Sequence, residues 1–278
     1  MQIRNYLHDN NIFRTLLHIL IVTIILAAIT PMGSNSLLTA ATTSQSLNSE
    51  KSYVNTATPI TVNVLIYNGK GAIPSSVSGI EKCFEVSNKK NLASNVYFNY
   101  STTTKINSKT LSGYNVLIIP GGIAETYLQN PEINVKDLKR FVSKGNGYVG
   151  ICAGSYVASS HVDGYYNGWG IAPHVHAKSA DYVGPLSISI TPNGKNILNS
   201  SNKEIMYHWN GPAMYETGST NNSLALYANN ETGYQGYVAI TNDTYGSGRV
   251  ILFGSHPELN PQKPETLVNM ILWTSKQN

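Results

Sequence analysis

The segment Gly147-Tyr-Val-Gly-Ile-Cys152-Ala-Gly-Ser-Tyr156 joins two kinds of local structure at a single cysteine. Its first half is apolar and rich in β-formers, and the stretch 153–160 is small and compatible with a helix. Cys152 is therefore predicted to lie at a sharp strand-to-helix corner, where Gly150 and Gly154 leave room for a tight backbone. Because such a corner exposes its side chain at the carboxyl edge of a sheet, Cys152 is the candidate nucleophile.

A second chemical group follows about a hundred residues later. The stretch 249–253 is predicted to be a buried strand, and His256-Pro-Glu258 comes just after it. In α/β sheets, ligands and catalytic groups gather beyond the carboxyl ends of strands. Residues two apart in an extended chain share a side, so Glu258 is predicted to orient His256, which in turn faces Cys152.

A glycine-rich turn completes the predicted site. The stretch 114–119 is a predicted strand, and it ends in Pro120-Gly121-Gly122. Bare backbone N–H groups at such a turn can stabilise a developing oxyanion. We expect the amides of Gly122 and Ala153 to serve this purpose.

The order of elements predicts an α/β fold. Strands at 60–67, 95–100 and 114–119 alternate with helices at 77–86 and 135–144, which indicates a parallel sheet covered on both faces. Beyond His161 the strand-like segments follow one another without long helices, so a mixed or antiparallel extension is expected in the C-terminal half. A hairpin turn is predicted at 243–248 and a closing helix at 264–273.

The N-terminal region differs from the rest of the chain. Arg4 and Arg14 precede an apolar run at 16–29, with small residues at Ala40-Ala41, which is typical of a secretory signal. We expect a signal peptide at 1–41, a Ser/Thr/Asn-rich linker at 42–58 and one domain at 59–278. The protein is accordingly expected to be secreted or extracytoplasmic. The alternative is that the N-terminal segment remains as an uncleaved anchor, and no other part of the chain is expected to contact a membrane.

Composition narrows the range of partners. The net charge of +4 over 278 residues is spread over isolated lysine and arginine pairs, so nucleic-acid binding is not expected. The chain has two cysteines, of which Cys83 is predicted to be a small buried hydrophobe and Cys152 a free thiol. His174 and His176 alternate on a predicted strand but lack a third ligand nearby, so no metal is expected there. No cofactor is expected either.

Five short motifs resemble the class I glutamine amidotransferase superfamily, and within it the domain found at the N-terminus of some biotin–protein ligases. The resemblance covers roughly residues 60–275, and it implies a three-layer, flavodoxin-like fold. Biotinylation is not expected, because no stretch of these 278 residues resembles a biotin-ligase catalytic domain. The motifs are Leu65-Ile-Tyr-Asn-Gly69, Pro120-Gly121-Gly122, Gly150-Ile-Cys152-Ala-Gly154, Tyr207-His-Trp-Asn210-Gly211-Pro212 and Gly254-Ser-His256-Pro-Glu258.

Four residues are candidates for contacting a substrate: Gly121, Tyr207, Asn210 and Gly211. An aromatic residue, an amide and glycines together can shape a substrate wall. The alternative interpretation of the last three is a strand that ends in a Gly-Pro turn.

The function that these residues favour is hydrolysis of an amide bond, in a peptide, a cell-wall component or a small molecule, by a Cys152-His256-Glu258 triad. An alternative is a non-catalytic binding or surface module on the same fold. The ammonia-donating role of true amidotransferases is disfavoured, because it requires a synthetase partner. A further alternative is a related family of stress proteins with a cysteine at the same kind of corner. Those proteins carry an acidic residue at the end of the first strand. This chain has Tyr67-Asn68-Gly69 there, which argues against that family.

Overall fold

The computed structural model describes residues 58–200, 202–218 and 222–277. The predicted signal and linker, residues 1–41 and 42–58, lie outside the described residues except for Thr58. The described residues all belong to one compact unit. No helix within the described ranges is long and apolar enough to cross a membrane.

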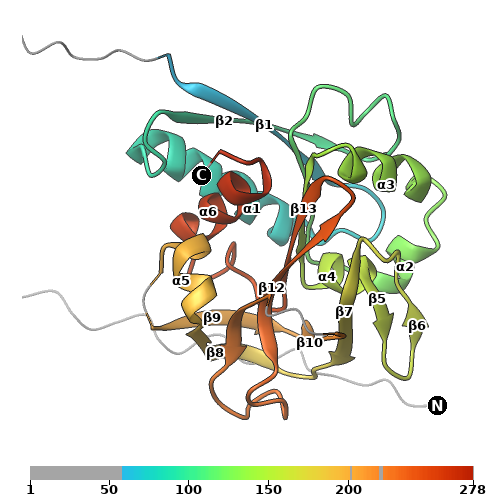
Figure 1. Ribbon diagram of the computed structural model, residues 1–278, viewed down its shortest axis with the longest axis vertical. Coiled ribbons are helices and arrows are strands. Elements are labelled where there is room, and N and C mark those ends of the chain that lie inside the picture. Colours follow the sequence, from blue (N-terminus) through green and yellow to red (C-terminus); the bar gives the residue numbers. More distant parts are fainter. Residues whose placement is uncertain (1–57, 201, 219–221, 278) are drawn as a thin grey trace, which may run out of the picture. The chain divides into compact units, whose positions relative to one another are not determined.

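A five-stranded parallel sheet forms the centre of this unit (Figure 1). Its spatial order is β2-β1-β3-β4-β13, and every neighbouring pair is parallel. These strands are β1 (Ile60–Tyr67), β2 (Val96–Thr103), β3 (Val116–Ile119), β4 (Gly147–Ile151) and β13 (Gly248–Phe253).

Helices cover both faces of the parallel strands, because side chains alternate between the two faces. In β3, Val116 and Ile118 pack into the cluster that includes α1 (Pro74–Lys90) and α6 (Pro264–Thr274). Leu117 and Ile119 pack into the opposite cluster with α3 (Val135–Ser143) and α4 (Ala153–Ala158). Figure 1 shows α1 and α6 on one side of β13 and α3 on the other. The predicted three-layer α/β fold is confirmed.

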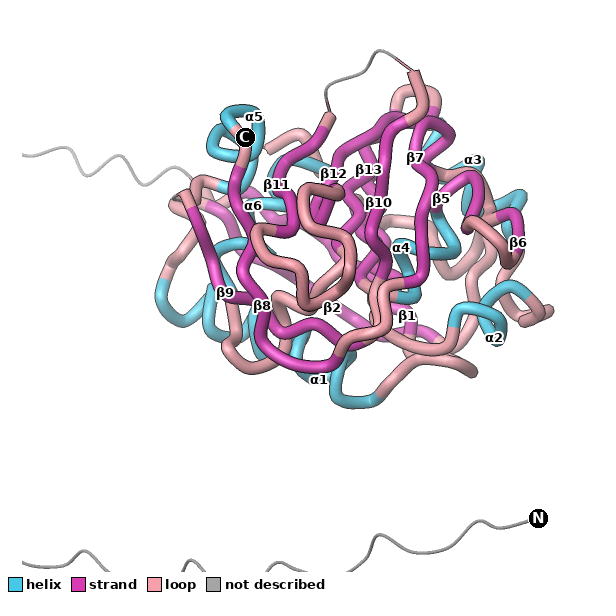
Figure 2. The backbone as a smooth tube through the Cα atoms, turned by 90° about the horizontal axis from the view of Figure 1, so that it is seen from below, coloured by secondary structure: helices cyan, strands magenta, loops and turns pink. Residues whose placement is uncertain are grey.

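The C-terminal half extends the sheet with mostly antiparallel strands, as predicted. From β13 the sheet continues through β12, β10, β7, β5 and β6, and a branch runs from β12 through β11 and β8 to β9 (Figure 2). The elements are β5 (Ser159–Val162), β6 (Tyr166–Asn167), β7 (Ala172–Ser179), β8 (Val183–Ile190), β9 (Lys203–Trp209), β10 (Pro212–Glu216), β11 (Ser223–Tyr227) and β12 (Val238–Tyr245).

Several local details differ from the sequence prediction. The predicted turn at 243–248 is narrower, because Asp243 to Tyr245 still pair with β13, and only Gly246 and Ser247 connect the strands. Gly246 has φ of 60°, a value that suits glycine in a tight hairpin. The stretch compatible with a helix runs to residue 160, but the helix ends at Ala158. The short helices α2 (Ala124–Leu128) and α5 (Pro192–Leu198) were not predicted.

Candidate active site

The candidate site lies beyond the carboxyl ends of four adjacent parallel strands. Cys152 directly follows β4, His256 follows β13 by three residues, and Gly121 follows β3 by two. Ser76 lies in the first turn of α1, the helix that follows β1. Because parallel strands end at one edge, residues separated by up to 182 positions in sequence meet there.

Cys152 has the strained backbone of a nucleophile elbow. Its φ of 51° and ψ of −108° fall outside the regions that residues with a side chain normally adopt. The neighbouring chain holds this conformation, since the Cys152 N–H donates to the Phe253 carbonyl at 2.8 Å. A Cβ on Gly154 would collide with the carbonyl of Ile119, so the helix lies against β3 at a distance that only glycine permits.

The thiol of Cys152 is sheltered but reaches the cavity. The residue is 5% exposed, and its Sγ donates to the Trp209 carbonyl at 3.4 Å. Both cysteines are free, and Cys83 is fully buried in the core under the sheet. Burial, with a further contribution from the charge of Glu258, raises the pKa of Cys83 to about 12, so this thiol is unreactive at neutral pH.

His256 and Glu258 form a buried pair. Nδ1 of His256 lies 2.7 Å from Oε1 of Glu258, and both residues are 1% exposed. The prediction assumed an extended chain between them, but residues 257–258 form a turn. The contact exists because the turn brings the carboxylate back under the ring, while the His256 N–H donates to the Tyr207 carbonyl at 2.7 Å.

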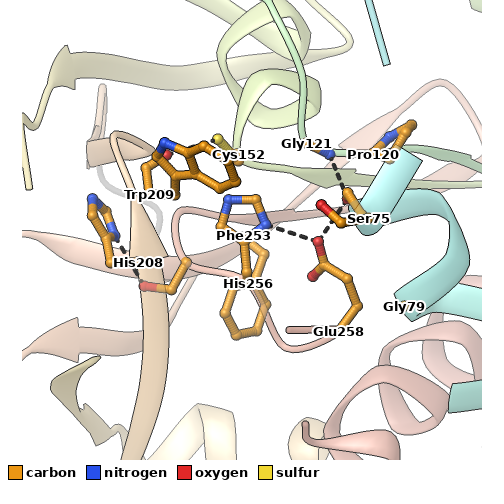
Figure 3. A network of polar contacts seen from close by, with 12 residues as sticks. Ser75, Gly79, Pro120, Gly121, Cys152, His208, Trp209, Phe253, His256 and Glu258 are labelled. Carbon is orange, nitrogen blue, oxygen red and sulfur yellow. Dashed lines mark hydrogen bonds and ion pairs between the residues drawn. The ribbon is translucent and has the colours of Figure 1, made fainter. Parts of the chain in front are cut away.

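The electrostatics of the pair favour an imidazolium. Burial lowers the pKa of His256, but the charges of Glu258 and Cys152, together with the hydrogen bond to Glu258, outweigh burial and raise the pKa well above its ordinary value of 6.5. In Figure 3 the ring of His256 lies between the sulfur of Cys152 and the carboxylate of Glu258. Within the described residues, Nε2 of His256 is buried and has no hydrogen-bond partner. Cys152 therefore acts on His256 through its charge and not through a hydrogen bond.

Ser76 connects Glu258 to the glycine turn. Its hydroxyl donates to Oε1 of Glu258 at 2.6 Å and accepts from the Gly121 N–H at 2.9 Å. Dashed lines in Figure 3 mark these contacts at the labelled Gly121 and Glu258. A Cβ on Gly121 would lie 2.5 Å from Cε1 of His256, so the turn is packed against the imidazole itself. The sequence did not single out Ser76, since its partners lie far away along the chain.

A cavity of about 380 Å³ opens in front of Cys152 and His256. The predicted oxyanion residues, Gly122 and Ala153, both line it, while the N–H of Gly121 is occupied by Ser76. The remaining lining residues are Ile73, Ile123, Ala124, Glu125, Tyr156, Val162, Tyr165, Tyr166, Ser179, Trp209 and Asn210.

Of the four predicted substrate residues, only Asn210 lines this cavity. Gly121 contacts the imidazole, and Tyr207 supplies the carbonyl that holds the His256 main chain. Gly211 packs against the carbonyl of Gly254, with the Cα of Cys152 3.6 Å from the position of a Cβ. These three residues therefore lie behind the reactive groups. The tyrosines of the cavity wall had no local motif that could mark them.

Two further groups of histidines lie apart from the cavity lining. His208 is fully buried, and burial lowers its pKa to about 4, so it is neutral at physiological pH. His174 and His176 lie on β7, but Nδ1 of His174 contacts Asp243 at 2.9 Å and Nδ1 of His176 contacts Tyr215 at 3.3 Å. In the described part of the chain no cluster of three potential ligands could hold a metal ion.

The described residues have a class I glutamine amidotransferase-like fold, as the sequence predicted. Residues 62–172 match the family model described as biotin-protein ligase, N terminal. A biotin–protein ligase of Schizosaccharomyces pombe is 26% identical over 226 residues, a match that covers 72% of this chain and 34% of the relative. The chain thus spans about a third of the length of that ligase.

Solved structures show the same fold at low sequence identity. A GMP synthase component from Thermoplasma acidophilum has a TM-score of 0.51 at 13% identity, covering 78% of this chain and 95% of its own. A ThuA-like protein from Bacteroides uniformis has a TM-score of 0.53 at 16% identity, covering 80% of this chain and 94% of its own. These likenesses concern the fold alone.

Proposed function

We propose that this domain is a cysteine-dependent hydrolase of amide bonds. The observation that carries the proposal is the state of His256: one ring nitrogen is fixed by Glu258, and the other, buried and without a geometric partner in the described residues, belongs to a ring that lines the same cavity as Cys152. A buried nitrogen without a partner costs free energy unless a ligand supplies one. The nitrogen of a scissile amide is such a ligand.

The reaction then proceeds in two steps. The Cys152 thiolate attacks the amide carbonyl carbon and forms a C–S bond, while the amides of Gly122 and Ala153 stabilise the oxyanion. His256 gives its proton to the leaving nitrogen as the C–N bond breaks. Water next attacks the thioester, its proton passes to His256, and the thiolate leaves. Glu258 holds the imidazole throughout, and Ser76 holds Glu258.

Thiol reactivity tests the first part of this proposal without a known substrate. At pH 6, Cys152 is expected to react with iodoacetamide at least about ten times faster than free cysteine, because the imidazolium stabilises the thiolate. Cys83→Ala is the matched control and keeps the fast reaction, while Cys152→Ala abolishes it. A Cys152 that reacts no faster than free cysteine would falsify the assignment of a nucleophile.

Hydrolysis is tested with peptide, cell-wall and small-molecule amides, measuring the release of amine or ammonia. Wild type is expected to hydrolyse at least one class, and Cys152→Ala to lose at least about 1000-fold in rate. Turnover of glutamine in preference to all of these would instead favour an ammonia-donating domain. A Cys152→Ala variant that retains every phenotype lost on deletion would favour a binding module.

The proposal includes a location outside the cytoplasm, which is supported by the sequence of residues 1–41 alone. Fractionation of the producing cell is expected to find the protein in the secreted or membrane fraction. Mass spectrometry of its N-terminus distinguishes a cleaved signal from an anchor.

A further inference from the structure

The side chains around the cavity have a distinctive balance of charge. Besides the Cys152-His256 pair, the sole acidic or basic side chain among its described lining residues is Glu125, in the first turn of α2. No lysine or arginine is among these lining residues. An anionic group bound beside Glu125 would therefore meet a carboxylate and no lysine or arginine.

The rest of the wall is aromatic and aliphatic, and much of it faces solvent. Ile123 is 56% exposed, Tyr165 65% and Trp209 39%, although each is a large apolar side chain. All three line the cavity. Exposed apolar side chains gathered at a cavity mark a surface that gains free energy when it is covered.

Tyr166 lines the cavity together with Glu125 and Cys152. Burial raises the pKa of Tyr166 above its usual range, and the charges of Glu125 and Cys152 raise it further. Both groups are therefore within electrostatic reach of one phenol ring, which remains neutral. The ring of Tyr165 stands edge-on to it, with centroids 6.5 Å apart. Aromatic faces beside a carboxylate are the surroundings that an ammonium group prefers.

We infer that the site takes an amide whose acyl part carries a positively charged amino group and an apolar or aromatic side chain, as in an aminoacyl amide, and that Glu125 selects the charge. This substrate class rests on the proposed hydrolase function. With the amide carbonyl at Cys152, the apolar group covers the aromatic wall and the ammonium lies on the side of Glu125. A carboxylate in that place is repelled.

Three derivatives of one amide test the inference at pH 6: L-phenylalaninamide, which is cationic at this pH, its N-acetyl derivative, which is neutral, and its N-succinyl derivative, which is anionic. We expect kcat/KM to fall in that order, by about two- to fivefold between cation and neutral amide, as is typical for an exposed charge pair. Glu125→Gln is expected to remove the difference between cation and neutral amide. Glu231→Gln, an exposed residue outside the cavity lining, is the control and retains it.

Binding separates a failure of this inference from a failure of the hydrolase proposal. The same three compounds are used to protect Cys152 from iodoacetamide in wild type, and to quench tryptophan fluorescence in Cys152→Ala. Protection and quenching in the order cation, neutral, anion without turnover would support the ligand class and overturn hydrolysis. Equal effects, no effect at millimolar concentration, or preference for the anion would overturn the inference, whatever the rate of hydrolysis.

Discussion

A single hydroxyl, that of Ser76, joins two parts of the candidate active site. Ser76 both donates to Glu258 and accepts from Gly121, so it fixes the carboxylate and the glycine turn relative to each other. The second carboxylate oxygen of Glu258 has no hydrogen-bond partner in the described residues. The orientation of this buried acid therefore depends on two contacts at Oε1, from Ser76 and His256.

Replacing Ser76 by alanine tests this role. Ser76→Ala leaves a buried carboxylate and a backbone N–H each short of a partner, so we expect a loss of about 1–3 kcal/mol in the free energy of unfolding. Hydrolysis and Cys152 alkylation at pH 6 are expected to slow by about three- to thirtyfold. Ser76→Thr restores the hydroxyl, and Ser75→Ala, at an exposed neighbour, is the control. Unchanged alkylation of a destabilised Ser76→Ala protein would mean that Ser76 serves stability alone.

At the scale of elements, the reactive corner depends on how closely α4 approaches the sheet. Gly154 lies against the carbonyl of Ile119, and Gly150 lies against α4, where a Cβ would be 2.6 Å from the carbonyl oxygen of Gly154. The six-residue helix α4 begins at this close contact with the sheet. The hydroxyl of Ser155 donates to the Gly150 carbonyl at 2.8 Å and so holds the first turn of the helix against β4. The strain at Cys152 is thus held by packing of the strands on either side.

Gly154→Ala is expected to destabilise the protein by about 2 kcal/mol or more, because the methyl group meets backbone that cannot move aside. Chemical denaturation measures this loss. The displaced corner should also reduce the alkylation rate of Cys152 in the fraction that remains folded. For comparison, Asn134→Ala removes the cap that accepts from the Asp137 N–H, costing about 1 kcal/mol without affecting the thiol. Equal thiol reactivity in the two variants would contradict the role given to this contact.

Elements with strong local patterns were predictable from the sequence. The apolar strands around 60–67, 114–119 and 249–253, the elbow at Cys152 and the closing helix follow from periodicity and glycine placement. The strands β5, β6 and β10 were not predicted, because their residues are mixed and their pairing is set by distant neighbours. For the same reason the sequence did not reveal Ser76, whose partners are 45 and 182 residues away. The cavity wall was missed because Glu125, Tyr156, Tyr165 and Tyr166 share no motif.

At the scale of the whole molecule, two buried histidines give the folded state opposite responses to pH. His208 has a pKa lowered to about 4, so its stabilising effect is present above 6.5 and is lost as the pH falls towards 4. His256 has a raised pKa, so its effect is present below 6.5 and is lost as the pH rises towards the folded value. The summed stabilisation from the two histidines is therefore largest near pH 6.5.

Stability is therefore expected to peak near pH 6.5. Acidification from 6.5 to 5 should cost about 2 kcal/mol through His208 alone, at 1.36 kcal/mol per unit. Guanidinium denaturation at intervals from pH 5 to 8.5 measures the profile. His208→Gln should flatten the acid side, and His174→Gln, at a half-exposed side chain, should leave it unchanged. A profile that rises or falls steadily through this range would refute the opposition of the two histidines.

The positions of the reactive groups along the chain have a consequence for biosynthesis. The glycine turn and Cys152 are made first, the cavity wall at Trp209 and Asn210 later, and His256 and Glu258 last of all. A nascent chain on the ribosome therefore carries an ordinary thiol until His256 has been translated and β13 has docked beside β4. If the chain crosses a membrane unfolded, Cys152 and His256 come together only after it has folded on the far side.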